Sequence, residues 1–116
     1  MSKYNLMVLW ENVFPHQNEA YDYAGRRILK SAIGNQNSRY CPTIDHIRPL
    51  SKGGQDVLEN IVICNQETNE EKADTFPVWY ANERRFQADR RKPQGIFAGD
   101  PQNGKGHRCA GDRKVL

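Results

Sequence analysis

Five polar residues in the middle of the chain have types that could support acid–base chemistry beside a metal ion. They are Asp45, His46, Asn60, Asn69 and Lys72. A neutral histidine can accept a proton from water near pH 7, because its reference pKa is about 6.5. Carboxylate and amide oxygens, as in Asp45 and Asn69, are hard ligands that suit Mg²⁺ or Mn²⁺. These residue types are compatible with a general base close to one hydrated divalent cation.

The spacing of these residues follows a known pattern. The central run reads Asp45-His46-Ile47-Arg48-Pro49-Leu50-Ser51-Lys52-Gly53-Gly54, then Asn60-Ile61, Cys64, Asn69 and Lys72. Over roughly residues 40–75 the chain resembles the HNH endonuclease family. In that family Asp-His ends a first strand, Pro and often Gly-Gly follow in a loop, Asn begins a second strand, and His or Asn lies on the next helix. Here Asn60 lies 14 residues after His46 and Asn69 lies 9 after Asn60, and the third motif residue is Asn, as in the HNH domains of RNA-guided CRISPR nucleases.

The resemblance implies an α+β fold with a ββα-metal core of the HNH (His-Me finger) type, an N-terminal extension and a basic C-terminal tail. It also implies a metal-dependent endonuclease that hydrolyses DNA phosphodiester bonds. Such a reaction needs an activated water and a group that stabilises charge on the phosphate and the leaving oxygen. By resemblance, His46 is the general base, and Asp45 and Asn69 hold one Mg²⁺ or Mn²⁺.

Asp45 and His46 are neighbours, which restricts how they can act together. Successive residues of a regular strand point to opposite faces, so both cannot face one metal ion there. The strand must bend, or the two side chains must act on different sides of the scissile phosphate; the resemblance favours separate roles. Asn60 is counted with the catalytic residues because it is expected to brace the loop that aims His46. Gly53 and Gly54 allow that loop to turn tightly.

Basic side chains near the motif are candidates for contacts with DNA. Lys72 lies three residues after Asn69 and shares its helix face, so we expect it to contact a phosphate or to remain a solvated surface charge. Arg48 sits beside the motif and could also bind a phosphate. Such contacts hold the backbone and carry no sequence information. Further candidates along the chain are Arg26, Arg27, Lys30, Arg84, Arg85, Arg90, Arg91 and Lys92.

The elements around the motif are predicted from local signals. Residues 40–47 are predicted to form a strand, residues 48–59 a loop, and the apolar run 61–64 a short buried strand. Asn65 can cap a helix over about residues 66–73, whose first turns are acidic. A loop held beside a helix by two strands is a typical place for functional side chains.

The flanking segments are less sharply patterned. Residues 4–10 fit either a strand or the start of a helix, and Arg26–Lys30 fits a strand. Pro77 is expected to end the motif helix and to begin a second helix over residues 78–91. From about Lys92 onward, Pro, Gly and basic residues dominate, and we expect a loosely ordered tail there. The predicted domains are therefore an HNH domain over 1–91 and a tail over 92–116.

Composition is compatible with one small domain that binds nucleic acid. The chain has 116 residues, of which 37% are hydrophobic and 27% charged, with a net charge of +3. Residues 1–81 carry a net charge of −2 and residues 82–116 a net charge of +5. A basic segment of this kind is typical of nucleic-acid binding. No apolar run approaches the roughly 20 residues of a membrane span, and no signal peptide is evident, so we expect a cytoplasmic protein without a membrane partner.

The three cysteines bear on the alternative functions. Many HNH proteins hold a structural zinc with two Cys-x-x-Cys pairs; this chain has none, so no structural zinc is expected. A set of Cys41, Cys64, His107 and Cys109 is the alternative, and it would make the chain a zinc-stabilised interaction domain. A catalytically inactive DNA-binding module is the other alternative. Partners left open are a second copy of the chain or a larger nuclease or packaging assembly, as in phages and mobile elements.

Overall fold

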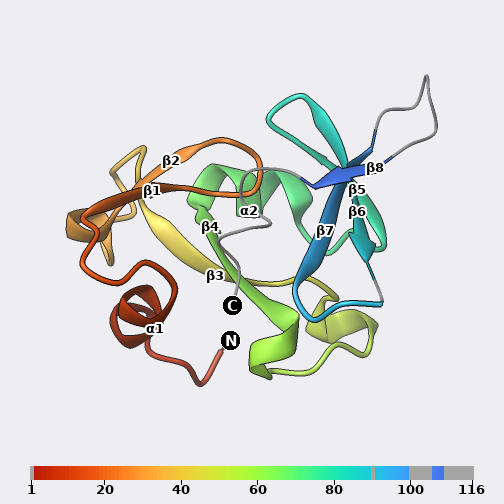
Figure 1. Cartoon of the computed structure of the whole chain (residues 1–116), viewed down its shortest axis with the longest axis horizontal. Helices are drawn as coiled ribbons and strands as arrows, with labels where there is room; N and C mark the ends of the chain where they lie inside the picture. Colours follow the sequence, from red (N-terminus) through yellow and green to blue (C-terminus); the bar gives the residue numbers. More distant parts are fainter. Residues whose placement is uncertain (1, 90, 100–105, 109–116) are drawn as a thin grey trace.

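A computed structural model describes residues 2–89, 91–99 and 106–108, the last three by their backbone. In the described part the fold is a small α+β arrangement of two α-helices and three antiparallel sheets (Figure 1). The elements in chain order are α1 (Leu6–Val13), β1 (Glu19–Tyr21), β2 (Arg27–Leu29), β3 (Pro42–His46), β4 (Ile61–Asn65), α2 (Gln66–Lys72), β5 (Val78–Ala81), β6 (Arg84–Asp89), β7 (Gly95–Gly99) and β8 (Gly106–Arg108). No described helix is long and apolar enough to cross a membrane.

The centre of the molecule is the antiparallel pair β3–β4, which α2 follows directly. Asp45 pairs with Val62 and His46 with Ile61. All five residues of β4 are buried, in agreement with the apolar run over residues 61–64. Asn65 caps α2, because its side chain accepts a hydrogen bond from the N–H of Glu67 (2.8 Å). These elements confirm the predicted strand, loop, strand and helix.

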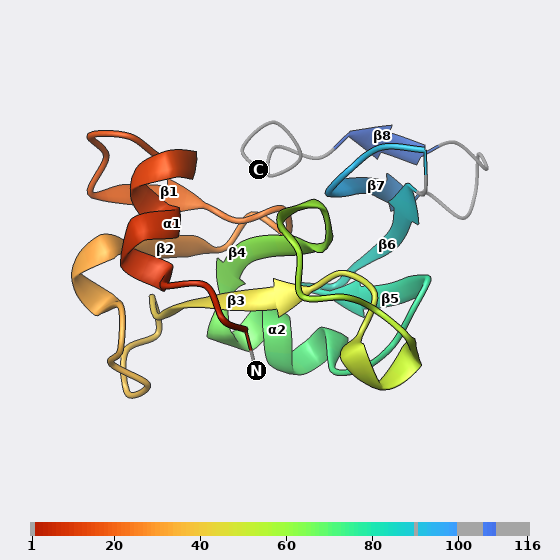
Figure 2. The same ribbon diagram turned by 90° about the horizontal axis from the view of Figure 1, so that it is seen from below.

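The two faces of β4 pack into two different apolar clusters. Ile61 and Ile63 pack with Leu9, Trp10 and other residues of the N-terminal part. Their neighbours Val62 and Cys64 pack instead with a cluster that includes Trp79 and Phe86 of the C-terminal sheet. Figure 2 shows α1 and the strands β5–β8 at opposite ends of the molecule, with β3 and α2 between them. The central pair is therefore supported from both sides.

The N-terminal segment resolves an ambiguity in the sequence. Residues 4–10 fitted either a strand or a helix start, and the structure forms α1 over Leu6–Val13. Asn5 begins it, because its side chain accepts from the N–H of Val8 (3.1 Å). Leu9 and Trp10 are buried, so the helix is held by apolar packing on one side.

The predicted helix over residues 78–91 is wrong, because this segment forms the hairpin β5–β6. Ala81 pairs with Arg84, which leaves a two-residue turn of Asn82 and Glu83, both with positive φ (50° and 63°). Burial alternates along β5, which is the period of a strand and not of a helix. Trp79 and Phe86 are paired across the hairpin and are both buried. Their shared apolar face decides the conformation.

The expectation of loose structure from Lys92 onward is also wrong for the residues described there. Residues 95–99 form β7, which pairs with β6, and residues 106–108 form β8, which pairs with β7. Ile96 is fully buried in the same cluster as Phe86. Ile96 and Ala98, which also packs against this cluster, lie in a segment whose Gly, Pro and basic residues suggested a tail. Arg90 and residues 100–105 and 109–116, including Cys109, lie outside the described part.

Candidate active site

Asp45 lies on β3 and is buried, with one carboxylate oxygen that lacks a hydrogen-bond donor. Its Oδ2 has no hydrogen-bond partner in the described part of the chain, and the Nζ of Lys72 lies 3.6 Å away. Burial raises the pKa of Asp45 to about 6, against the opposing effects of the Lys72 ammonium and the His46 ring. A buried carboxylate oxygen without a donor is unusual and calls for an explanation, such as a bound cation.

Asn69 projects from α2 toward the same face of β3 as Asp45. Its Nδ2 donates to Thr43 Oγ1 (3.0 Å). Thr43 and Asp45 are two residues apart on the strand and therefore share a face. The Asn69 amide oxygen accepts no hydrogen bond from the described residues. The structure thus brings the Asp45 carboxylate and the Asn69 side chain to the interface between β3 and α2, where the amide nitrogen of Asn69 contacts β3.

Lys72 is fully buried, with an exposed fraction of 0%. Its Nζ donates to the backbone oxygen of His46 (3.0 Å) and lies 5.1 Å from the centre of the Trp79 ring. The expectations of a phosphate contact or of a solvated surface charge are therefore both wrong. The reason is the hairpin β5–β6, a segment predicted to be a helix, whose residue Trp79 packs against Lys72.

His46 points to the other face of the strand, as the alternation of a regular strand requires. Its Nε2 lies 2.9 Å from Asp56 Oδ1, and its side chain is 12% exposed. Asp56 also accepts from Ser2 Oγ (2.7 Å) and from the backbone N–H of Lys3 (2.6 Å). The Lys3 N–H is the largest cause that lowers the pKa of Asp56 to about 2, with further lowering by His46 and Ser2.

Asp56 was not singled out from the sequence. It lies in the loop between the Gly-Gly pair and Asn60, and the only available signal was that it is one of two carboxylates there, with Glu59. Its partners include Ser2, which is 54 residues away in the chain. No local pattern indicates such a contact.

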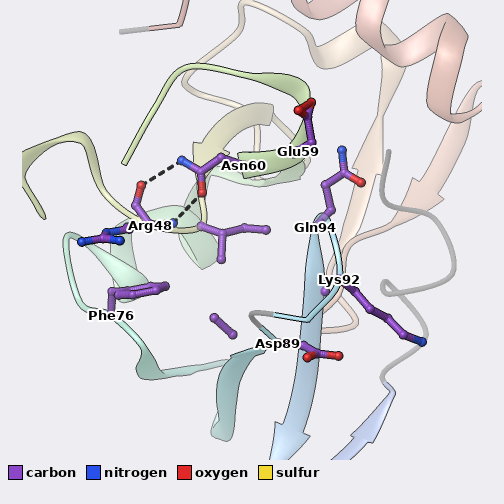
Figure 3. Close-up of a pocket in the computed structure, with 10 residues that line it drawn as sticks. Arg48, Glu59, Asn60, Phe76, Asp89, Lys92 and Gln94 are labelled. Atoms are coloured by element: carbon purple, nitrogen blue, oxygen red, sulfur yellow. Dashed lines mark hydrogen bonds between the residues drawn. The ribbon is translucent and has the colours of Figure 1, made fainter. Parts of the chain in front are cut away.

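Asn60 makes hydrogen bonds within the loop that follows β3. Its Oδ1 accepts from the N–H of Arg48 (2.9 Å), and its Nδ2 donates to the backbone oxygens of Arg48 (3.0 Å) and Gln55 (2.9 Å). Figure 3 shows both bonds to Arg48. Gly54 is needed for this path, because a Cβ there would lie 1.8 Å from the Arg48 oxygen. The loop beside His46 is therefore tightly fixed.

Comparison with known families agrees with this arrangement. A family model described as HNH endonuclease matches residues 22–78. Residues 22–78 belong to the HNH endonuclease family. The comparisons with curated proteins and with solved structures gave no match. The matched segment, called the HNH domain below, contains β2, β3, β4 and α2, whereas α1 and most of the C-terminal sheet lie outside it. Membership indicates nuclease activity, in a family that generally uses a divalent metal ion.

Three of the residues expected to bind DNA form ion pairs with acidic side chains of the same chain. They are Arg26, Arg27 and Lys30. Arg26 forms ion pairs with Glu67 (3.1 Å) and Glu71 (2.5 Å), and its side chain is 15% exposed. Two further residues of the group are also paired: Arg27 with Glu19, and Lys30 with Glu11. This part of the surface therefore has its basic charge largely balanced within the chain.

The side chain of Arg48 contacts a backbone oxygen and an aromatic ring. It is exposed, its Nε donates to the Lys52 oxygen (2.8 Å), and its guanidinium lies over the Phe76 ring at 5.8 Å (Figure 3). No carboxylate among the described residues pairs with it. Arg48 also lines a pocket of about 310 Å³ between the loop of the HNH domain and the turn that joins β6 to β7. Asp45, His46 and Asn69 do not line this pocket.

The structure offers no ready zinc site in its described part. No group of three or more His, Cys, Asp or Glu side chains is placed to hold a metal ion among the described residues. Cys41 and Cys64 are buried free thiols, and burial raises the pKa of Cys64 well above its ordinary value. Cys109 and the side chain of His107, which complete the alternative zinc set, lie outside the described part.

Proposed function

We propose that the chain is a metal-dependent HNH endonuclease that hydrolyses DNA phosphodiester bonds, with a ββα-metal core formed by β3, β4 and α2. One observation carries the proposal. A buried Asp45 oxygen without a hydrogen-bond donor lies at the interface of β3 and α2, to which α2 also contributes the Asn69 side chain. His46, the next residue on β3, is the base, and its side chain faces the opposite side of the strand, so that the base and the metal ligands act on different sides of the scissile phosphate.

The donor set fits Mg²⁺ or Mn²⁺. Both ions prefer oxygen ligands, and Mg²⁺ is often held by one or two protein groups, with water and phosphate completing its coordination. Asp45 and Asn69 would hold the ion, with no structural zinc elsewhere. When bound, a divalent cation supplies Lewis-acid stabilisation of the phosphate and the leaving oxygen.

The chain's own residues prepare the attack on the phosphate. Asp56 engages Nε2 of His46, and no described group occupies Nδ1. Nδ1 can therefore accept a proton from the attacking water. Lys72 holds the backbone oxygen of His46 and so fixes the end of β3, while Asn60 fixes the loop that follows. Arg48 contacts a DNA phosphate beside the site.

Supercoiled plasmid with Mg²⁺ tests the proposal. Wild-type protein is expected to nick or linearise the plasmid, and a chelator should stop the reaction. His46→Ala should slow cleavage by about 10²- to 10⁴-fold, the usual contribution of a general base. Asp45→Asn should also be slow. His16→Asn is the matched control, because His16 is exposed and its positive φ (61°) suits Asn. Cleavage by His46→Ala at the wild-type rate would refute the assignment.

The second candidate function is a DNA-binding module without catalysis. One observation favours it: the Lys72 ammonium already balances the Asp45 carboxylate at 3.6 Å. If this ion pair excludes a divalent cation, the protein would bind DNA and leave it intact. DNA retained on a gel by wild-type protein, with no cleavage in either Mg²⁺ or Mn²⁺, would favour this function over the nuclease.

A further inference from the structure

We propose that Asp56 and the segment Ser2–Tyr4 form a positioning device for His46, in which the N-terminal segment fixes Asp56 and Asp56 fixes the imidazole ring. The value of the device for catalysis rests on the proposed nuclease function. Asp56 and the N-terminal residues are positioning residues here, because they act through His46 and do not touch the substrate.

Three donors converge on the Asp56 carboxylate. Asp56 Oδ1 is within hydrogen-bond distance of His46 Nε2 (2.9 Å) and of Ser2 Oγ (2.7 Å). The other oxygen, Oδ2, accepts from the backbone N–H of Lys3 (2.6 Å). The Asp56 side chain is only 20% exposed, although it lies in a surface loop. A carboxylate with donors on both oxygens has a fixed orientation, so the partner ring is also fixed.

The hydrogen bond determines which nitrogen of His46 carries the proton. The three donors keep the pKa of Asp56 low, so the carboxylate is ionised near neutral pH and can only accept hydrogen bonds. In the neutral ring the proton must then reside on Nε2, which leaves a lone pair on Nδ1. Carboxylate partners fix histidine tautomers in this way at many metal sites.

The N-terminal segment can serve as a support because it is itself held. Ser2 Oγ accepts from the N–H of Tyr4 (3.2 Å), and Tyr4 packs against the N-terminal apolar cluster. Asn5 then caps α1, whose Leu9 and Trp10 pack in the same cluster as Ile61 and Ile63. The support thus runs from the core through α1 to the loop carboxylate.

Only part of this device lies in the matched HNH segment, which contains His46 and Asp56 but not Ser2–Tyr4. The family match begins at residue 22, whereas Ser2, Lys3 and α1 precede it. His46 pairs with Ile61 on the strand, and paired residues share a face of the sheet. The face of β3–β4 that carries His46 is therefore the face that α1 covers. The N-terminal extension supplies the support for the base from outside the family domain.

The first experiment measures the tautomer of His46 directly. In ¹⁵N-labelled protein, the ring nitrogen shifts distinguish a protonated Nε2 from a protonated Nδ1, and a His46→Gln sample identifies the His46 signals. Wild-type protein should show the proton on Nε2. Asp56→Ala should shift the ring toward a mixture of tautomers, whereas Asp56→Asn should retain the wild-type form because its amide oxygen can still accept.

The second experiment measures plasmid cleavage with Mg²⁺ by the same proteins. Asp56→Ala should lose about 10- to 100-fold in rate, as is usual when the partner of a metal-site histidine is removed. Asp56→Asn should lose less, and Ser2→Ala, which removes one of three donors, should lose only a few-fold. Asp74→Asn is the matched control for the lost charge, because Asp74 is exposed. It should cleave at the wild-type rate.

The outcomes separate this inference from the proposed function. Ring shifts of Asp56→Ala identical to those of wild type, with active wild-type protein, would overturn the positioning device alone. If the ring shifts respond to Asp56 but no protein cleaves DNA, the contact stands and the nuclease proposal fails. If Asp56→Ala does not fold, Asp56→Asn and Ser2→Ala decide: the device requires that Ser2→Ala slow cleavage, and an unchanged rate overturns it.

Discussion

Lys72 is a charged side chain with no exposed surface, so its burial has a high free-energy cost. An ammonium taken out of water is strongly unfavourable unless it is paired and hydrogen-bonded. Here the carboxylate of Asp45, the backbone oxygen of His46 and the face of the Trp79 ring surround it. These three contacts explain how a lysine with no exposed surface is tolerated beside the site.

Replacing Lys72 by Met should destabilise the protein in a pH-dependent way. The change leaves an ionised Asp45 buried and unpaired, so the free energy of unfolding at pH 7.5 should fall by about 3 kcal/mol. Asp45 has a pKa of about 6 in the folded protein, above its ordinary value, so a larger share is neutral at pH 5. The loss should therefore be smaller at pH 5. Urea denaturation of wild type and Lys72→Met at both pH values measures it.

Lys52→Met is the matched control, because Lys52 is exposed in the loop, and its effect should be small at either pH. For wild type, the raised pKa means that the folded state binds the Asp45 proton more tightly than the unfolded state. The contribution of Asp45 to stability therefore decreases as pH rises from about 4 to about 6. An equal loss at pH 5 and pH 7.5 for Lys72→Met would contradict the pairing.

Among the elements, the pair β3–β4 presents its two faces to different supports. Asp45 lies on the face that α2 covers, with Asn69 and Lys72, and His46 lies on the face that the N-terminal segment and α1 reach. The proposed metal ligands and the proposed base are therefore held by separate parts of the chain. A substitution in α2 should therefore affect metal binding more than the position of His46, and a substitution in the N-terminal segment should do the reverse.

The turn of the hairpin β5–β6 offers a test of an element that the sequence analysis assigned wrongly. Both turn residues have positive φ. The φ of Glu83 is 63°, and its side chain is exposed. Asn-Gly is the preferred pair for a two-residue hairpin turn of this kind, so Glu83→Gly should raise the free energy of unfolding by about 1 kcal/mol. Gly25→Ala should lower it by a similar amount, because Gly25 has φ +85°. Urea denaturation measures both, and destabilisation by Glu83→Gly would argue against the hairpin.

At the scale of the whole molecule, net charge gives a poor guide to where DNA lies. The chain has a net charge of +3, but Arg26, Arg27 and Lys30 are each engaged with acidic side chains. Arg48 keeps an exposed guanidinium between the loop of the HNH domain and the C-terminal sheet (Figure 3). DNA held near Asp45 and His46 would therefore be contacted first by Arg48.

The salt dependence of DNA binding distinguishes these basic residues. Each phosphate contact contributes about one to the slope of log affinity against log salt concentration. Arg48→Ala should weaken binding of an inactive His46→Ala protein to a short duplex and reduce the slope by about one. Arg27→Ala, whose side chain pairs with Glu19, should leave the slope unchanged. A larger effect of Arg27→Ala than of Arg48→Ala would restore the DNA track expected from the sequence.

The sequence by itself determined the central elements and the membership of the family. The run 61–64, the cap at Asn65 and the Gly-Gly pair are local signals, and each gave the element that it predicted. The candidate ligands and base could be named for the same reason, since the motif has fixed spacing. The roles of Asp45, His46 and Asn69 in chemistry remain predictions for the experiments above.

Only the tertiary structure decided how the charged groups near the site are held. The contact between Lys72 and His46 joins residues 26 apart, and that between Ser2 and Asp56 joins residues 54 apart. The hairpin β5–β6 likewise depends on Trp79 and Phe86 sharing a core with β4. Burial and pairing of this kind arise when distant segments pack together, and the local pattern of residues around each group does not encode them.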